Sequence, residues 1–130
     1  MLYDQTLSRV ETYFDKTASK TWEQLTSDAP VSKIRQTVRI GRERMRNKLL
    51  GQLPNDLSEA QILDAGCGTG QLTTELVKRG ASVVATDISN SLIQIAKKRT
   101  PKDYHRKINF HVGDLCNKDL GQFDYVIAMD

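Results

Sequence analysis

No stretch of this sequence is apolar over the roughly 20 residues that a membrane-spanning helix requires. The first residues, Met1 to Thr6, lack both the basic and the apolar segment of a secretory signal, which argues against export. Cysteine is scarce, and the spacing of Cys67 and Cys116 matches no metal site. We therefore expect a cytoplasmic protein whose thiols are reduced and which binds no metal.

Strong net charge is missing as well, and so are internal repeats and low-complexity segments. The formal net charge is +3, which is too small to indicate a nucleic-acid partner by itself. Charged residues make up 27% of the chain and hydrophobic residues 38%, as in ordinary globular proteins. A chain of 130 residues is long enough to bury one hydrophobic core.

The sequence does contain a glycine-rich turn after a short apolar run. The run Ile62–Asp64 ends in a carboxylate, and Gly66, Gly68 and Gly70 alternate after it. Glycine lets the main chain come into contact with a ligand, and a following helix offers unpaired N–H groups. Asp87 ends a second apolar run. Open α/β sheets bind nucleoside-bearing cofactors at the carboxyl ends of their strands in this way.

The glycine spacing narrows the class of cofactor. Dinucleotide sites have the pattern G-x-G-x-x-G and hold a pyrophosphate, whereas this turn reads G-x-G-x-G after Asp64. A carboxylate at the strand end repels a pyrophosphate and attracts an ammonium or sulfonium group. The stretch Leu63 to Gly70 resembles motif I of the class I S-adenosylmethionine-dependent methyltransferases. A tight strand-to-helix turn without a ligand is the alternative interpretation.

Strands and helices alternate from residue 60 onward. The pattern predicts an α/β fold with a Rossmann-like sheet of parallel strands in the order 3-2-1-4. The helix over 71–79 is expected to close at Gly80, and the helix over 89–99 at Pro101. The strands are expected at about 61–64, 82–86, 108–112 and 124–129.

The region before the sheet predicts a helical arm over residues 1–55, followed by the half-domain 56–130. One or two helices are expected over 5–26, and a longer one from an N-cap at Ser32 to Pro54. The longer helix combines two faces: an apolar stripe of Ile34, Val38, Met45 and Leu49, and an arginine stripe of Arg35, Arg39, Arg42 and Arg46.

Segments of this arm support a sharper resemblance. Tyr13 to Ala18, Trp22, Thr26 to Ser32 and Thr37 to Arg42 resemble the magnesium protoporphyrin IX O-methyltransferases of chlorophyll and bacteriochlorophyll synthesis. The likeness covers most of residues 9–130. It implies a seven-stranded sheet of which this chain holds one half, with the C-terminal half missing. Because its last strand would then expose an unpaired edge, we expect the chain alone to be marginally stable and inactive.

The resemblance implies methyl transfer from S-adenosylmethionine to a propionate carboxylate of Mg-protoporphyrin IX. Magnesium would then arrive with the substrate. A magnesium chelatase subunit is a candidate partner, and peripheral attachment to a photosynthetic membrane is an alternative to a purely cytoplasmic location. Two other interpretations stay open. One is a methyltransferase for another small-molecule acceptor, and the other is a non-catalytic fragment with the S-adenosylmethionine fold.

The resemblance also implies cofactor-binding positions, which are Asp64, Ala65, Gly66, Cys67, Gly68, Gly70, Asp87, Ile88, Asp114, Leu115 and Met129. Asp87 would accept hydrogen bonds from the ribose or cap the following helix. Asp114 would bind the adenine amine with Leu115 against the ring, or the two would form an ordinary turn. Asp64 would touch the ligand or support the loop. No catalytic residue is identified.

Substrate-binding candidates lie in the arm: Tyr13, Phe14, Trp22, Arg35, Arg39 and Arg42. The aromatic residues could stack on a flat macrocycle or form the core of the arm. Seven Lys or Arg residues lie between Lys33 and Lys48, against Glu43 alone. They could steer a dianionic porphyrin, although a solvated helix face is the commoner outcome for such a stripe. Nucleic acid is a third reading, but no aromatic platform is interleaved with the arginines.

Overall fold

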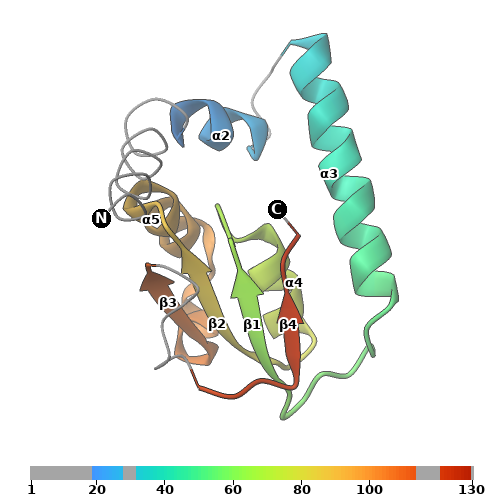
Figure 1. The fold of residues 1–130 in the computed structure, drawn as a ribbon, viewed down its shortest axis with the longest axis vertical. Coiled ribbons are helices and arrows are strands. Elements are labelled where there is room, and N and C mark those ends of the chain that lie inside the picture. The colour runs from blue at the N-terminus through green and yellow to red at the C-terminus, as the bar shows by residue number, and fades with distance from the viewer. Residues whose placement is uncertain (1–18, 28–31, 114–120, 130) are drawn as a thin grey trace, which may run out of the picture.

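The computed structural model describes residues 19–27, 32–113 and 121–129. Its centre is a sheet of four parallel strands in the order β3-β2-β1-β4, as the alternating pattern predicts (Figure 1). The strands are β1 (Gln61–Ala65), β2 (Ser82–Asp87), β3 (Ile108–Val112) and β4 (Tyr125–Ile127). Their carboxyl ends point toward the side of the molecule where helix α2 lies.

Helices surround this sheet and belong to two groups. α4 (Gln71–Lys78), α5 (Asn90–Arg99) and the 3-10 helix η2 (Lys102–Lys107) connect the strands. α2 (Ser19–Leu25) and α3 (Lys33–Gly51) precede the sheet in the chain. α2 crosses above the carboxyl ends of the strands, and α3 stands beside the β4 edge (Figure 1).

The core forms where α4 and α5 pack against the central strands. Ile62 of β1, Leu76 of α4 and Ile93 of α5 are almost completely buried. Four of the five residues of β1 are buried, as expected for an inner strand that is covered on both faces. The burial of β1 fixes the position of the turn that follows it, and this turn carries the glycines.

Several element boundaries differ from the sequence expectation, and one short helix was not expected. β4 ends at Ile127 and not at residue 129, and it pairs with β1 through three residues only. α3 ends at Gly51, before Pro54, because the N–H of Gln52 turns back to the carbonyl groups of Leu49 and Leu50. The 3-10 helix over Lys102–Lys107 was not predicted, and it begins after Pro101, whose fixed φ suits a first turn.

Over most of its length, α3 is oriented opposite to the usual arrangement of an amphipathic helix, and only Leu49 of the predicted apolar stripe packs against the core. Ile34, Val38 and Met45 of the predicted apolar stripe are 78%, 44% and 53% exposed. The arginine stripe instead faces α2, where the Arg39 guanidinium donates to the carbonyl oxygen of Leu25 at 2.7 Å. The interpretation of the arginines as a solvated face is therefore wrong for Arg39.

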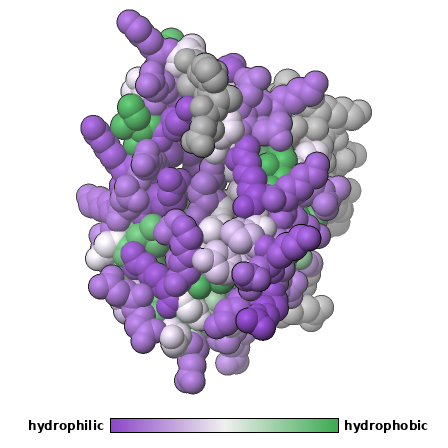
Figure 2. All heavy atoms as spheres, turned by 180° about the vertical axis from the view of Figure 1, so that it is seen from behind, coloured by the Kyte–Doolittle hydropathy of each residue, from purple (hydrophilic) through white to green (hydrophobic). Residues whose placement is uncertain are grey.

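The back face of the molecule is predominantly polar. Seen from behind, the molecule is mostly hydrophilic, and hydrophobic side chains form only small separate patches (Figure 2). Within residues 19–27, 32–113 and 121–129, no helix has the length and apolar character needed to cross a membrane.

The turn at Gly80 provides a test of this packing. Gly80 has a φ of 101°, and a Cβ added there would lie 2.9 Å from Ser58 Oγ and 3.2 Å from the Ser58 backbone. We expect Gly80→Ala to lower the free energy of unfolding by at least about 1–2 kcal/mol, because left-handed backbone is costly for alanine.

Gly41→Ala in the middle of α3 is the matched control. A Cβ at Gly41 would meet no atom within 4 Å, so alanine should raise the free energy of unfolding by roughly 0.5–1 kcal/mol. Urea titration followed by circular dichroism measures both variants, and equal stabilities would contradict the assigned turn.

Candidate functional site

The glycine loop connects β1 to α4 at the carboxyl edge of the sheet. The N–H of Cys67 donates to the carbonyl oxygen of Thr86 at 2.8 Å, which ties the loop to the end of β2. Gly70 is the N-cap residue of α4 and has a φ of 88°. The loop thus places the N-terminus of α4 beside the ends of β1 and β2, where α/β sheets bind ligands.

Two of the loop glycines lie where a Cβ would be packed more tightly than usual. A Cβ added to Gly70 would lie 3.1 Å from the Ala96 Cβ of α5. A Cβ added to Gly68 would lie 3.1 Å from the indole Nε1 of Trp22, which belongs to α2. The loop is therefore enclosed by α5 on one side and by the arm on the other.

Asp87 holds the glycine loop directly. Its Oδ2 accepts a hydrogen bond from the N–H of Gly68 at 3.0 Å, and its Oδ1 accepts one from the N–H of Ser89 at 2.9 Å. The N-cap of α5 is Ser89, whose hydroxyl oxygen accepts from the N–H of Leu92, so the expectation that Asp87 caps this helix is wrong. A carboxylate oxygen can accept more than one hydrogen bond, which is the chemistry that a ribose hydroxyl requires.

Asp64 lies beneath the loop and is 2% exposed. It accepts a hydrogen bond from the hydroxyl of Thr73 on α4 at 2.5 Å. The carboxylate therefore joins the end of β1 to the helix that follows, which is the loop-supporting role. Thr73 was missed in the sequence because a threonine inside a helix carries no specific signal.

Of the other cofactor candidates outside the glycine loop, three lie within the described residues. Ala65 is buried at the end of β1, Ile88 is half-buried next to Asp87, and Met129 is half-buried against the core. Asp114, Leu115, Tyr13 and Phe14 lie outside the described residues. Their assigned roles remain predictions.

Within the described residues, Trp22 contacts the glycine loop and α3. Its Nε1 faces Gly68, and the Arg42 guanidinium carbon lies 4.3 Å from the centroid of its ring system, a cation–π distance. Of the other two arginine candidates, Arg39 donates to the carbonyl groups of Leu25 and Gln24, and Arg35 is exposed.

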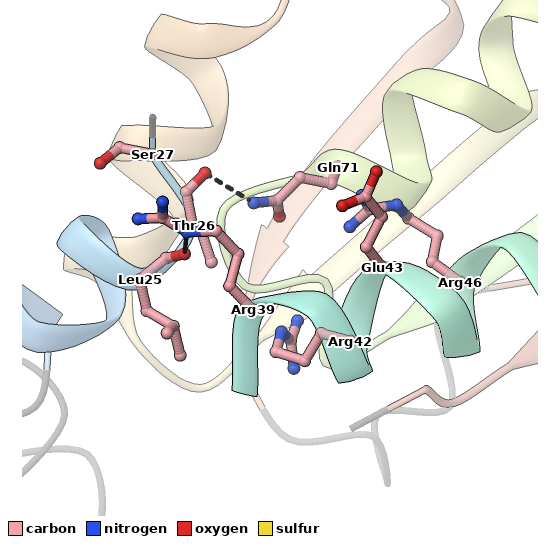
Figure 3. Close-up of a pocket in the computed structure, with 8 residues that line it drawn as sticks. All are labelled: Leu25, Thr26, Ser27, Arg39, Arg42, Glu43, Arg46 and Gln71. Carbon is pink, nitrogen blue, oxygen red and sulfur yellow. Dashed lines mark hydrogen bonds between the residues drawn. The ribbon is translucent and has the colours of Figure 1, made fainter. Parts of the chain in front are cut away.

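A polar cavity of about 250 Å³ lies between the C-terminal end of α2, helix α3 and the first residue of α4 (Figure 3). Arginines of α3 and the side chain of Gln71 from α4 point into this region, whereas Glu43 is its one acidic residue. Clustered guanidinium groups favour carboxylate or phosphate ligands. The lining residues are Leu25, Thr26, Ser27, Arg39, Arg42, Glu43, Arg46 and Gln71.

The site shows no sign of a metal centre in the part of the chain that the structure describes. No group of three or more His, Cys, Asp or Glu side chains there is arranged to hold a metal ion. Its ligand-binding features are hydrogen-bonding groups and charge.

Cys67 lies inside the loop as a buried thiol. Burial raises its pKa far above the ordinary value, and the negative charges of Asp64 and Asp87 raise this pKa further. Because the thiolate is the reactive form, a raised pKa leaves little of it at pH 8. We expect Cys67 in a Cys116→Ser background to react with a disulfide reagent at least about tenfold more slowly than a free thiol.

The same variant unfolded in urea is the control, and its thiol should react at the free-thiol rate. Rapid labelling of the folded chain at pH 8 would show that Cys67 is accessible and would contradict the described burial.

Two curated proteins are similar to nearly the whole chain. The magnesium-protoporphyrin O-methyltransferase of Rhodobacter capsulatus is 56% identical over 98% of this chain and 58% of its own length. That of Synechocystis is 29% identical over 99% of this chain and 56% of its own length. The chain thus spans little more than half the length of these relatives.

A solved structure has the same fold with the arm included. The crystal structure of the Synechocystis magnesium protoporphyrin IX methyltransferase with bound S-adenosylmethionine aligns with a TM-score of 0.86 at 27% identity. The alignment covers 94% of this chain and 60% of the other. Residues 62–130, more than half of the chain, match the model of the methyltransferase domain family. This match covers β1 from Ile62 onward, the glycine loop and Asp87, and the chain belongs to the methyltransferase domain family.

Proposed function

We propose that the glycine loop and Asp87 bind S-adenosylmethionine as the methyl donor of a methyltransferase. The observation that carries this proposal is the hydrogen bond from the Gly68 N–H to the Asp87 carboxylate. It places an acidic acceptor next to a glycine turn at the carboxyl edge of a parallel sheet, as nucleoside-binding sites of this topology require. The two carboxylates at the strand ends, Asp64 and Asp87, favour a cationic ligand over a pyrophosphate.

The acceptor we propose is a propionate carboxylate of Mg-protoporphyrin IX. This part of the proposal rests on the 56% identity to the Rhodobacter capsulatus enzyme, because that similarity includes the arm as well as the sheet. Sheet motifs are shared by methyltransferases of many substrates, whereas the arm lies where an acceptor would enter. The arginine-lined cavity below α2 suits an anionic group of such an acceptor.

The proposed methyl transfer requires alignment of the two reactants more than it requires acid–base residues. A propionate has a pKa near about 4–5 by analogy with glutamate, so it is ionised at neutral pH and needs no general base. S-adenosylmethionine, when bound, supplies an activated methyl group on a sulfonium. The protein's task is to hold the two reactants in line and exclude water, which can contribute roughly 7–11 kcal/mol. The loop and Asp87 would fix one reactant and the arm the other.

The division of the chain follows from this assignment. Residues 1–55 would act as a lid on the acceptor side, and residues 56–130 as the donor-binding half of the sheet. Association with a magnesium chelatase subunit would deliver the porphyrin, and peripheral attachment to a photosynthetic membrane would place the enzyme near its apolar product.

Calorimetry of Asp87 variants tests the donor assignment. We expect the chain to bind S-adenosylmethionine and its demethylated product, with little affinity for NAD. Asp87→Ala should weaken binding by roughly 1.5–3 kcal/mol, the range for hydrogen bonds to a charged group. Asp87→Asn should lose less, because the amide can still hydrogen-bond to a hydroxyl.

Asp103→Ala is the control, because Asp103 is exposed on η2, away from the loop. Binding of NAD without S-adenosylmethionine would overturn the donor assignment. An unchanged affinity of Asp87→Ala would remove Asp87 from the site.

A chimera tests the acceptor. In it, this chain replaces the matching segment of the Rhodobacter capsulatus relative, which supplies the rest of the enzyme. We expect methyl transfer to Mg-protoporphyrin, measured as the labelled ester, and a much lower rate with metal-free protoporphyrin. A chimera that binds S-adenosylmethionine but methylates neither porphyrin would refute the proposed acceptor and leave the donor assignment intact.

A further inference from the structure

Helix α2 has seven residues, and side chains from three other elements bind the carbonyl groups at its C-terminal end. The last carbonyl groups of any helix lack partners within the helix and form the negative end of its dipole. Here the carbonyl oxygens of Glu23, Gln24, Leu25 and Thr26 all accept hydrogen bonds from Arg39, Gln71 or Arg99.

The three donors converge from distant parts of the chain. Arg39 of α3 donates from Nε to Leu25 at 2.7 Å and from Nη2 to Gln24 at 2.8 Å. Arg99, the last residue of α5, donates from Nη2 to Glu23 at 3.1 Å. Its Nη1 donates to the carbonyl oxygen of Thr26 at 3.2 Å and to the Thr26 hydroxyl at 2.8 Å.

Gln71 connects this set directly to the glycine loop. It follows Gly70, and its Nε2 donates to the carbonyl oxygen of Thr26 at 3.1 Å (Figure 3). Its Oε1 accepts from the hydroxyl of Thr69 at 2.9 Å, so a loop residue orients the amide. A change in the conformation of the loop would therefore move the Gln71 amide, whose hydrogen bond holds the end of α2. We call Arg39, Gln71 and Arg99 the clamp.

Among the described residues, the clamp supplies most of the hydrogen bonds that tie α2 to the rest of the chain. A helix of seven residues is not stable alone, and among its residues of described burial only Leu25 is buried. Yet this helix carries Trp22, whose indole lies against Gly68. The position of that indole thus depends on hydrogen bonds to the helix end.

We propose that Gln71 and Arg99 are positioning residues that hold Trp22 against the glycine loop, so that the indole forms one wall of the donor site. The hydrogen bonds themselves belong to the structure, whereas the effect on the donor rests on the proposed function. The packing of α2 against the loop would then also place the indole at the site of the methyl donor. The arginine and the glutamine act through Trp22 and do not themselves touch the reacting atoms.

Fluorescence provides a direct readout, because Trp22 is the only tryptophan in the chain. Arg99→Ala should shift its emission to longer wavelength and increase quenching by acrylamide about twofold or more, without ligand present. The emission wavelength and quenching of Arg99→Lys should lie between those of the unmodified chain and those of Arg99→Ala, because one ammonium group cannot reproduce all the hydrogen bonds of the guanidinium group. Gln71→Glu should resemble Arg99→Ala, because a carboxylate cannot donate to the Thr26 carbonyl oxygen.

Lys98→Ala is the matched control: it removes a positive charge from the same turn of α5, and Lys98 is exposed. Its emission and quenching should equal those of the unmodified chain. Far-ultraviolet circular dichroism should show the same melting of the sheet in all variants. If Arg99→Ala leaves both the emission and the quenching of Trp22 unchanged, the clamp does not position the indole and the proposal fails.

Titration with S-adenosylmethionine then tests the link to the donor site. We expect Arg99→Ala to bind it about three- to tenfold more weakly, a modest loss because Arg99 is exposed, and Lys98→Ala to bind it normally. A fluorescence change with unaltered affinity would refute the link between clamp and site. Absence of binding to the unmodified chain would refute the proposed donor, while the fluorescence comparison would still decide the position of Trp22.

Discussion

The hydrogen bond between the Gly68 N–H and the Asp87 carboxylate is the contact on which the site depends. It joins the turn after β1 to the end of β2, and the adjacent parallel pairing of these strands brings the two residues together. Without this hydrogen bond, a turn of alternating glycines could take many conformations. Ordering the turn when a ligand binds would then cost conformational entropy. This hydrogen bond fixes the turn before α4 relative to the end of β2, and together they form one edge of the site.

This edge depends in turn on a buried carboxylate that is hydrogen-bonded. Asp64 is 2% exposed, and a buried carboxylate is costly unless its oxygens have partners. The Thr73 hydroxyl is one such partner, and it comes from the helix that the loop starts. The acidic group that marks the strand end in the sequence therefore has a structural role. A ligand role at the same carboxylate stays a prediction.

The sheet order, the glycine loop and the position of Asp87 could be predicted because they depend on local patterns. Alternating apolar runs and a glycine turn are visible within a few residues, and parallel pairing brings strand ends together. The clamp could not be predicted in this way. Arg99 lies 73 and 76 residues from Thr26 and Glu23, and a basic residue in the last turn of α5 equally suits an ordinary interaction with its own helix dipole.

The interpretation of the α3 arginines as a solvated face was wrong for Arg39 for a related reason. Its sequence offers two faces, and hydrophobic burial ordinarily decides which one turns inward. Here the inward neighbours are the carbonyl groups at the end of α2 and the ring of Trp22, and both attract guanidinium groups. The partner surface is polar, so the arginine face packs against it and Ile34 stays exposed. A sequence pattern read without its partner cannot reveal this choice.

Charges of opposite sign lie on the two sides of the glycine loop. Carboxylates of Asp64 and Asp87 lie on the sheet side of the glycine loop, and guanidinium groups of α3 and α5 lie on the arm side. A polyanion such as a pyrophosphate would be repelled from the sheet side. The sheet side would instead attract the sulfonium of S-adenosylmethionine, and the arm side would attract the anionic groups of the proposed acceptor. The electrostatics thus assign donor and acceptor to opposite sides of the loop, in agreement with the proposed function.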